Sequence, residues 1–499
     1  MLRKCSVALF ALLFCVICTF PAMALPVADF SVESADLPTC VDQAQTAAVA
    51  SELFDGFGTE DAPYLITSAE DLLNLSERIN AGDADYLTAY YRQSADICLT
   101  GTPFAPIGTE TSPFAGVYDG DGYRIEYHDA VFSGNTAGIF GYANNAGFAN
   151  MTVDLVGTAE NATGVDAGAV CAYYKANVKY QTFDISRCRS FGSLTVTSRE
   201  GTSTVGGLFG RVLATDNCVV FMTDCMSTMD VTSNGYTMGN AGGLVGEVVA
   251  NVSGFVSLVR CYTENTVSAT SKCYFAHCGG ITGGFDQDTN SWSDWQDVSG
   301  SANAASLSSE DAYNFKDCFT ASALSVHAGM SSGNNIGWLS SYVLSPVKTT
   351  NSYHLQDESV VTTINAENGT AVTERAALFD QAFLTETLGF DLENVWLHLG
   401  SEELLLRSRL KQLYITEVGK SEVTVLPVNC AAGQLIAAYR DSDGAFIGTS
   451  FISYDGTEHP ITVAVPEIYA SRAASTTFYL LDLFTLRPLV AASGAIVLG

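Results

Sequence analysis

Residues 205–212 read VGGLFGRV, and this short phrase of glycines and aliphatic residues recurs along the chain. The other copies are AGIFGYA at 137–143, AGGLVGEV at 241–248 and CGGITGGF at 278–285. The period is nearly constant, because Gly207 to Gly243 spans 36 residues and Gly243 to Gly280 spans 37. Such a period is typical of one supersecondary unit stacked many times, so the phrase predicts a solenoid.

A second anchor keeps the same period. Cys188, Cys225 and Cys261 are separated by 37 and 36 residues. The step then lengthens to 57 between Cys261 and Cys318, and the glycine phrase lengthens by the same amount. We therefore infer an insertion of about twenty residues between Gly280 and Cys318, with the repeat resuming in register after it.

The repeats favour strands over helices. Their alternation is short, β-branched residues are common, and no amphipathic helical period is visible from Gly138 to Tyr353. If each repeat is one coil, equivalent residues lie about 4.8 Å apart along the axis. We then expect a cysteine ladder flanked by two apolar ladders, with the members Ile185, Met222, Leu258 and Phe315 in one and Leu194, Val231, Val267 and Leu324 in the other. The thiols pack as small apolar groups or form disulfides between neighbouring rungs; both alternatives stay open.

The AGGLVG and VGGLFG phrases, each followed by a short strand ending in cysteine, resemble the GLUG-motif repeats of secreted and surface proteins of bacteria. The stretch that usually opens such arrays is matched in order by GFGTEDAPYLITSAEDLLNLSERIN, ADICLTG, FAPIGT and FAGVYDGDGYRI. The resemblance covers Gly56 to Leu410 and departs from the pattern in VDAGAVCAYY and NNIGWLSS. It implies a right-handed parallel β-helix acting as a stalk, an adhesin or a noncatalytic module. The motif carries no catalytic residue, so none is transferred.

The composition fits a secreted, acidic product. Arg3 and Lys4 precede an apolar run, and Ala22-Met23-Ala24 supplies small residues before a cleavage point, so residues 1–24 read as a signal peptide. A leader or linker at 25–54 precedes the β-helix of 55–410. No later stretch is apolar enough for a membrane span. The formal net charge of −31 disfavours nucleic acid as a partner.

Past Leu410 the glycine phrase ends. Five strand-like runs, VTVLPV, QLIAAYR, AFIGTSFIS, PITVAVPE and TFYLLDLF, are separated by turn-forming residues. This spacing predicts a small antiparallel β-sandwich over 411–499, with Asp443-Gly444 closing one hairpin. The complete prediction is an all-β chain: a right-handed parallel β-helix, a short N-terminal capping helix and a C-terminal antiparallel β-sandwich.

Two local motifs have structural interpretations. Ser68-Ala69-Glu70-Asp71 resembles a capping box, and the apolar positions after it predict a helix that covers the open end of the coil. Asp119-Gly120-Asp121-Gly122 lacks the spacing of a calcium loop, so we predict a hairpin turn between FAGVY and YRIEY. Cys273 and Cys278 with His277 between them lack a second half for zinc, and no metal or cofactor is expected.

The insertion gives the sharpest functional hypothesis. A solenoid tolerates such loops on one face, which is often the binding face. Aromatic rings can pack on sugars or peptides, and carboxylates can hold hydroxyl groups. The predicted binding residues are Phe285, Trp292, Trp295, Asp286, Asp288, Asp294 and Asp297.

An enzymatic alternative comes from the carboxylates before the ladder cysteines. Asp224 and Asp317 occupy equivalent places, as in groove-lining residues of a polysaccharide lyase or hydrolase, but Arg187 and Arg260 fill that place in the other repeats. Alternating charges favour a salt-bridged ladder, and the six histidines join no catalytic constellation. We therefore predict a secreted or cell-surface, monomeric, noncatalytic protein that binds glycans or surface proteins, with the polysaccharide-degrading enzyme as the alternative.

Overall fold

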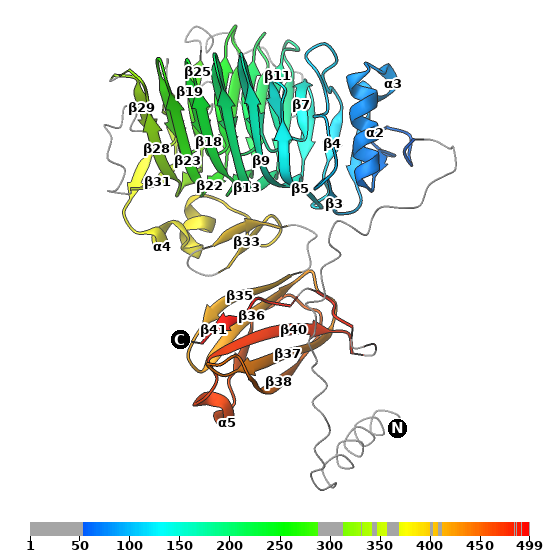
Figure 1. The fold of residues 1–499 in the computed structure, drawn as a ribbon, viewed down its shortest axis with the longest axis vertical. Coiled ribbons are helices and arrows are strands. Elements are labelled where there is room, and N and C mark those ends of the chain that lie inside the picture. Colours follow the sequence, from blue (N-terminus) through cyan, green and yellow to red (C-terminus); the bar gives the residue numbers. More distant parts are fainter. Residues whose placement is uncertain are drawn as a thin grey trace. The chain divides into compact units, whose positions relative to one another are not determined.

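The computed structural model describes residues 53–287, 313–330, 332–341, 347–356, 369–399, 403–407, 412–483, 485, 487–490 and 492–498. Four parallel sheets, called A to D here, contain most of the strands between residues 64 and 372 (Figure 1). Within them each strand pairs in parallel with the strands of neighbouring repeats. This arrangement is a β-helix-like stack.

Sheets A and B hold the longer series of strands. Sheet A comprises β1 (Tyr64–Ile66), β2 (Tyr90–Gln93), β4 (Val117–Asp119), β8 (Gly147–Ala149), β12 (Thr182–Ser186), β16 (Val219–Thr223), β21 (Phe255–Val259), β26 (Phe315–Lys316) and β30 (Thr349–Thr350). Sheet B comprises β3 (Ile97–Cys98), β5 (Arg124–Phe132), β9 (Thr152–Asn161), β13 (Arg189–Ser198), β17 (Met226–Ser227), β18 (Asp230–Gly235), β22 (Tyr262–Thr263), β23 (Thr266–Ser271), β27 (Phe319–Thr320), β28 (Ala323–His327), β31 (Tyr353–Leu355) and β32 (Thr370–Val372).

Sheets C and D flank the glycine phrase. Sheet D comprises β6 (Thr136–Ala137), β10 (Gly164–Gly168), β14 (Thr202–Gly206), β19 (Gly239–Gly242), β24 (Ala276–Gly279) and β29 (Asn334–Gly337). Sheet C comprises β7 (Phe140–Asn144), β11 (Cys171–Ala176), β15 (Phe209–Ala214), β20 (Val245–Ala250) and β25 (Thr282–Gln287). A repeat visits the sheets in the order A, B, D and C, so each rung of the stack is one sequence repeat.

The predicted apolar ladders are confirmed residue by residue. In sheet A the register pairs Ile185 with Met222, Met222 with Leu258 and Leu258 with Phe315. In sheet B the register pairs join the other predicted series, Leu194, Val231, Val267 and Leu324. All eight side chains are buried in one continuous hydrophobic cluster. Stacking of like residues therefore builds the core.

Both irregular copies of the phrase contribute a strand to sheet D. Ala167 in VDAGAVCAYY pairs with Val205, and Ile336 in NNIGWLSS pairs with Cys278. The resulting sheet D has six strands. Departures from the repeat consensus therefore change side chains without interrupting sheet D.

The glycines of the phrase are required by close backbone approach. A Cβ atom built on Gly243 would lie 2.0 Å from the carbonyl oxygen of Gly280 in the next rung. At Gly207 the corresponding atom would lie 2.2 Å from the carbonyl oxygen of Gly243. No other residue fits between backbones at such distances without moving a strand.

The cysteine ladder consists of free thiols. Cys188, Cys225, Cys261 and Cys318 are fully buried, and the backbone N–H of Cys261 donates to Sγ of Cys318 at 3.4 Å. Of the two open alternatives, packing as small apolar groups is the one observed. Cys98 differs from them because it is disulfide-bonded.

A helix covers the first rungs, as the capping motif predicts. α2 spans Ala69–Asn80 and is followed by the short α3, Ala84–Leu87. The Ser68 hydroxyl accepts from the backbone N–H of Asp71 at 3.2 Å. The buried leucines and isoleucine of α2 join the core cluster, and α2 lies at the end of the stack formed by the first strands (Figure 1).

The predicted hairpin at Asp119–Gly122 is wrong. β4 pairs with β2 and β8 in sheet A, whereas β5 pairs with β3 and β9 in sheet B. The turn is therefore a corner between two parallel sheets. Asp121 and Gly122 have φ values of 47° and 77°, and the Asp119 carboxylate accepts from the backbone N–H of Asp121 at 2.9 Å. Local turn chemistry is shared by hairpins and corners, so it could not separate them.

The segment after β32 packs on the outside of sheet B. It contains α4 (Arg375–Leu378), the π-helical turn η5 (Phe383–Thr387) and the antiparallel pair β33 (Trp396–His398) and β34 (Leu404–Leu406). Its apolar side chains form a second cluster with Met226, Tyr262 and Phe319 of sheet B. Outward apolar residues at this position of the rungs are thus covered by the chain itself.

The C-terminal residues form two antiparallel sheets that share one hydrophobic cluster. One sheet contains β35 (Gln412–Val418), β36 (Glu422–Val428) and β39 (Ile461–Ala464); the other contains β38 (Phe446–Tyr454), β37 (Gly433–Arg440), β40 (Ser475–Leu481) and β41 (Ile496–Val497). All five predicted strands are present, and β37 pairs with β38 across the predicted Asp443-Gly444 turn. The short helix α5 spans Glu467–Ala470.

Candidate functional site: a polar seam between sheets C and D

The glycine phrase brings the outer face of sheet D against sheet C. A Cβ atom on Gly210 would lie 2.5 Å from the backbone nitrogen of Ala167, and one on Gly246 would lie 2.8 Å from Cγ2 of Thr204. Strands of sheet C therefore lie directly against the preceding rung of sheet D. We call the strip of outward side chains along this contact the polar seam.

Two rows of residues in register form the polar seam. The sheet D row is Thr136, Asp166, Thr204, Asn240, His277 and Asn335. The sheet C row is Tyr142, Tyr173, Arg211, Glu247 and Gly284. Unlike the core ladders, these rows combine aromatic, basic, acidic, amide and hydroxyl side chains. The seam is therefore the part of the repeat where side chains are not fixed by stacking.

An ion cluster lies in the middle of the seam. Nη2 of Arg211 is 3.3 Å from Oδ1 of Asp166 and 3.0 Å from Oε2 of Glu247. The same nitrogen donates to Oγ1 of Thr204 at 3.4 Å. One guanidinium nitrogen is thus shared by two carboxylates and a hydroxyl group from three neighbouring rungs. Each of the three charged side chains is less than one third exposed.

Burial shifts both carboxyl groups in the same direction. It raises the pKa of Asp166 above its usual value, while the Arg211 guanidinium and a hydrogen bond from Thr204 oppose the rise. Burial also raises the pKa of Glu247; Arg211 opposes this, and the charges of Asp166 and Asp286 add to it. Desolvation of a carboxylate favours its protonated form, so the cluster takes up protons more readily than exposed carboxylates do.

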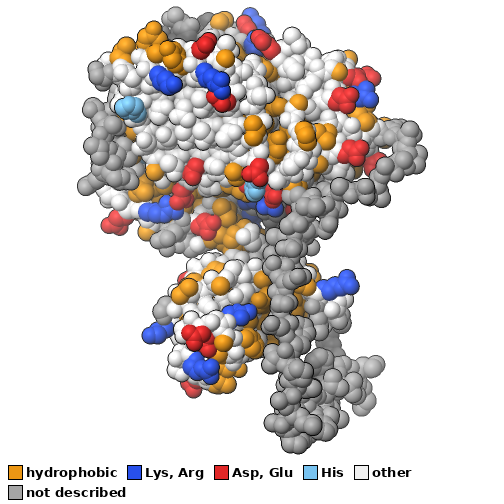
Figure 2. Space-filling model, viewed as in Figure 1, with side chains coloured by type: hydrophobic (Ala, Val, Ile, Leu, Met, Phe, Trp, Pro, Cys, Tyr) orange, Lys and Arg blue, Asp and Glu red, His pale blue; other side chains and the backbone are white. Residues whose placement is uncertain are grey.

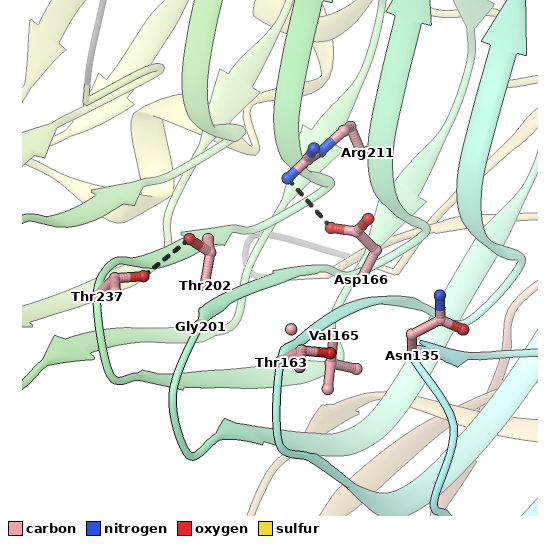
Figure 3. Close-up of a pocket in the computed structure, with 9 residues that line it drawn as sticks. Asn135, Thr163, Val165, Asp166, Gly201, Thr202, Arg211 and Thr237 are labelled. Carbon is pink, nitrogen blue, oxygen red and sulfur yellow. Dashed lines mark hydrogen bonds and ion pairs between the residues drawn. The ribbon is translucent and has the colours of Figure 1, made fainter.

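A groove of about 450 Å³ opens beside this cluster (Figure 3). Arg211 comes from β15 of sheet C, and the other lining residues come from strands of sheet D and from the loops that lead into them. The full set is Asn135, Thr163, Gly164, Val165, Asp166, Gly201, Thr202, Arg211 and Thr237. Thr202 and Thr237 share a hydrogen bond of 3.2 Å across one wall, and Arg211 faces Asp166 at the other (Figure 3). Hydroxyl groups and glycines dominate this surface.

Two buried polar atoms in the seam have no hydrogen-bond partner within the described part of the chain. One is Nε of Arg211, whose side chain lines the groove, and the other is Oδ1 of Asn240, a residue that is 2% exposed. Such groups are rare in folded proteins, since each costs about 1–3 kcal/mol when left unsatisfied. Because both atoms are buried, water is the molecule small enough to satisfy them.

Two tyrosines extend the seam away from the cluster. The rings of Tyr142 and Tyr173 occupy successive rungs with centroids 5.5 Å apart and planes tilted by 41°. The Asn135 amide donates to the Tyr142 hydroxyl at 2.8 Å, which ties the pair to the groove. Partial burial raises the pKa of both hydroxyls, so they remain neutral donors and acceptors.

The structure places two of the seven sequence-predicted binding residues. Phe285 is fully buried, with its ring 5.8 Å from that of Phe315, so it is a core residue and its ring is not offered to a ligand. Asp286 is half-buried on β25 and pairs in register with Val249. The remaining five, Asp288, Trp292, Asp294, Trp295 and Asp297, lie outside the described residues.

The seam residues were missed by reading the sequence. Glycines, cysteines and apolar positions carry the repeat, whereas the seam positions share no single residue type. In AGIFGYA, VGGLFGRV and AGGLVGEV the residue after the last glycine belongs to the seam, and comparing those positions would have placed Tyr142, Arg211 and Glu247 in one row. Asp166 could have been found from its equivalence to Thr204.

The cysteine and histidine group at 273–278 is divided by the fold. Cys278 is buried in sheet D in register with Ala241, and Cys273 lies in the preceding loop. His277 is also buried, which lowers its pKa to about 4. Across the described ranges, no three His, Cys, Asp or Glu side chains converge as metal ligands.

One face of the molecule is shown in Figure 2. Over the stacked strands, most of its surface is backbone and uncharged polar side chains, with acidic and basic groups in small neighbouring sets (Figure 2). Among the residues that the structure describes, no helix combines the length and apolar character needed to cross a bilayer.

Comparisons with known proteins give limited similarity. A scan against protein families finds no match. Halomucin of Haloquadratum walsbyi is 30% identical over 210 residues, which cover 40% of this chain and 2% of halomucin, so the match spans a very small part of that relative. A solved structure from Bacteroides ovatus, named as a candidate immunoglobulin A1 protease, is 20% identical with a TM-score of 0.46, covering 71% of this chain and 95% of that one.

Proposed function

We propose that this chain is a noncatalytic binding protein that acts outside the cell or at its surface and holds glycans in the groove beside the polar seam. The observation that carries the proposal is a groove of about 450 Å³ lined by hydroxyl and amide groups, with the Arg211 side chain at one wall. Sugar hydroxyls both donate and accept hydrogen bonds, so they match this mixed lining. The neighbouring tyrosine rings supply apolar faces on which a sugar ring can pack.

The rest of the proposal concerns architecture and location. We take the repeats to be of the GLUG type, the stack to be a right-handed β-helix, and the C-terminal sheets to be a β-sandwich. The signal-peptide pattern and the disulfide at Cys98 support export to an oxidising compartment. The halomucin similarity agrees with a surface or secreted product. The insertion after Asp286 is retained as a second contact surface for glycans or surface proteins.

Retention on immobilised polysaccharides tests the function. We expect the mature chain to be retained, and replacing both Tyr142 and Tyr173 with alanine to weaken retention at least tenfold. Thr202→Val, which removes a groove hydroxyl at almost constant volume, should also weaken it. Tyr180→Ala is the matched control, because Tyr180 is 46% exposed and does not line the groove.

Two results would count against the proposal. Equal retention of the groove variants and wild type would remove the groove as the binding site. Release of reducing or unsaturated ends from the polysaccharide would instead identify the enzymatic alternative.

A further inference from the structure

The charge in the groove is confined to two of its nine lining residues, Asp166 and Arg211. Glu247 completes the cluster from the next rung of sheet C. Counted as formal charges, two carboxylates and one guanidinium leave the cluster with an excess negative charge. The cation that would attract an acidic ligand is therefore already neutralised within the protein.

The hydrogen bonds of Arg211 also disfavour an acidic ligand. Arginine recognises carboxylates and sulfates through a planar fork of two N–H groups. Here Nη2 is shared by Asp166, Glu247 and Thr204, so one arm of the fork is occupied. Nε has no hydrogen bond to the described residues, but it is buried, so it offers an acidic ligand no second N–H of the fork. This arrangement suits an uncharged acceptor better than a bidentate acid.

Negative charges near the groove strengthen its preference for uncharged ligands. Asp286 on β25 adds negative potential at Glu247, and Glu110 acts on Tyr142 and Tyr173 in the same way. The whole chain has a formal charge of −31. An acidic polysaccharide approaching this groove meets repulsion that no described groove residue offsets.

We infer that Asp166 and Glu247 are specificity residues that mask Arg211, so that the groove accepts uncharged saccharides and rejects acidic ones. This inference rests on the proposed glycan binding and adds the class of ligand. The inference also predicts that the ligand preference can be reversed: removing the two carboxylates should convert the groove into a site for acidic saccharides.

A polysaccharide pair that differs only in charge provides the test. Polygalacturonate and its fully methyl-esterified form share one backbone, and retention of each is measured at pH 7 and low ionic strength. We expect wild type to retain the esterified polymer at least tenfold better. The double variant Asp166→Asn with Glu247→Gln should gain at least tenfold in retention on polygalacturonate, and this gain should disappear in high salt.

The matched control frees two arginines elsewhere. Glu160 pairs with Arg199 and Glu458 pairs with Arg407, so Glu160→Gln with Glu458→Gln changes the net charge equally without touching the seam. This control should gain nothing on polygalacturonate. Single Glu247→Gln, which leaves one carboxylate on Arg211, should show an intermediate gain and serves if the double variant does not fold.

The outcomes separate the two proposals. If both seam variants fold and neither gains retention on polygalacturonate, or if the control gains as much, the masking role is overturned. If wild type retains polygalacturonate as well as the ester, the selectivity is overturned while glycan binding stands. If wild type retains no polysaccharide but the seam variants acquire the acidic one, masking is supported and the proposed function fails.

Discussion

Arg260 and Asp224 form a two-bonded ion pair between adjacent rungs. Nε and Nη2 of Arg260 donate to the two carboxylate oxygens of Asp224 at 2.7 and 2.8 Å. Asp224 also accepts from Nε1 of Trp396 at 3.2 Å, in the segment that covers sheet B. The predicted salt-bridged ladder is confirmed for this pair, which makes Asp224 a structural residue rather than an acid or base.

Replacing Asp224 with asparagine should destabilise the fold. Asp224 is 8% exposed, and the change removes one charge from a partly buried pair. We expect a loss of about 2 kcal/mol in the free energy of unfolding. Asparagine tolerates the positive φ of 53° at this corner, so backbone strain is not added. Urea unfolding measures the loss. Glu160→Gln, at the exposed Arg199 pair, should leave stability nearly unchanged; equal losses would contradict the structural role.

The glycine phrase makes a steric prediction. Gly243→Ala would place a Cβ atom 2.0 Å from the Gly280 carbonyl oxygen, so we expect loss of about 3 kcal/mol or failure to fold. Gly284→Ala is the matched control in sheet C, because its nearest contact would be Glu247 Cγ at 3.9 Å. It should change the free energy of unfolding by less than about 1 kcal/mol. Comparable thermal midpoints for the two variants would show that the backbones are not in close contact at Gly243.

The buried thiols should resist alkylation. Burial raises the pKa of Cys225 and Cys318, and a protonated thiol is a poor nucleophile. Among the nine described free cysteines, Cys273 alone is not buried. Brief iodoacetamide treatment of the native chain followed by peptide mass mapping should therefore modify Cys273 and leave the ladder unmodified. In denaturant all nine should react. Rapid native modification of Cys225 or Cys261 would contradict the stacked ladder.

The sequence predicts the structure correctly wherever apolar residues recur at one period. The core ladders through Met222 and Val231 follow directly from equal spacing, because stacking of identical rungs leaves no freedom there. The C-terminal strands followed from alternation and turn residues. In contrast, the corner at Asp121 was read as a hairpin, since its local conformation does not reveal which strands pair.

The polar seam could not be derived in the same way. It depends on the approach of Gly210 to Ala167 and on the resulting contact of Arg211 with residues 45 positions before it and 36 after it. Periodicity places those residues on rungs, but it does not state which outward faces meet. The prediction that Phe285 binds a ligand failed for a different reason. Phe285 lies beside the insertion, but it is also the last core residue of its strand.

Acidification should change the ligand preference of the groove. Because burial raises the pKa of Asp166 and Glu247, these groups take up protons at a higher pH than exposed carboxyls do. As the medium is acidified from pH 7, Arg211 loses its neutralising partners before exposed carboxyls are protonated, and retention on a permanently charged polymer, dextran sulfate, should rise. Retention on uncharged dextran should not rise in parallel.

Two variants isolate this effect from the general loss of negative charge in acid. Asp166→Asn with Glu247→Gln should retain dextran sulfate already at pH 7, with a weaker pH dependence. Arg211→Gln should show only the small rise due to the rest of the chain. The same proton uptake affects stability. Because the pKa values are raised in the folded state, the stability that protonation contributes is present below the ordinary carboxyl pKa of about 4 and is lost as pH rises through the raised values. The double variant should therefore lose less stability than wild type between pH 4 and pH 7. Equal pH profiles for wild type and Arg211→Gln would show that Arg211 is not unmasked.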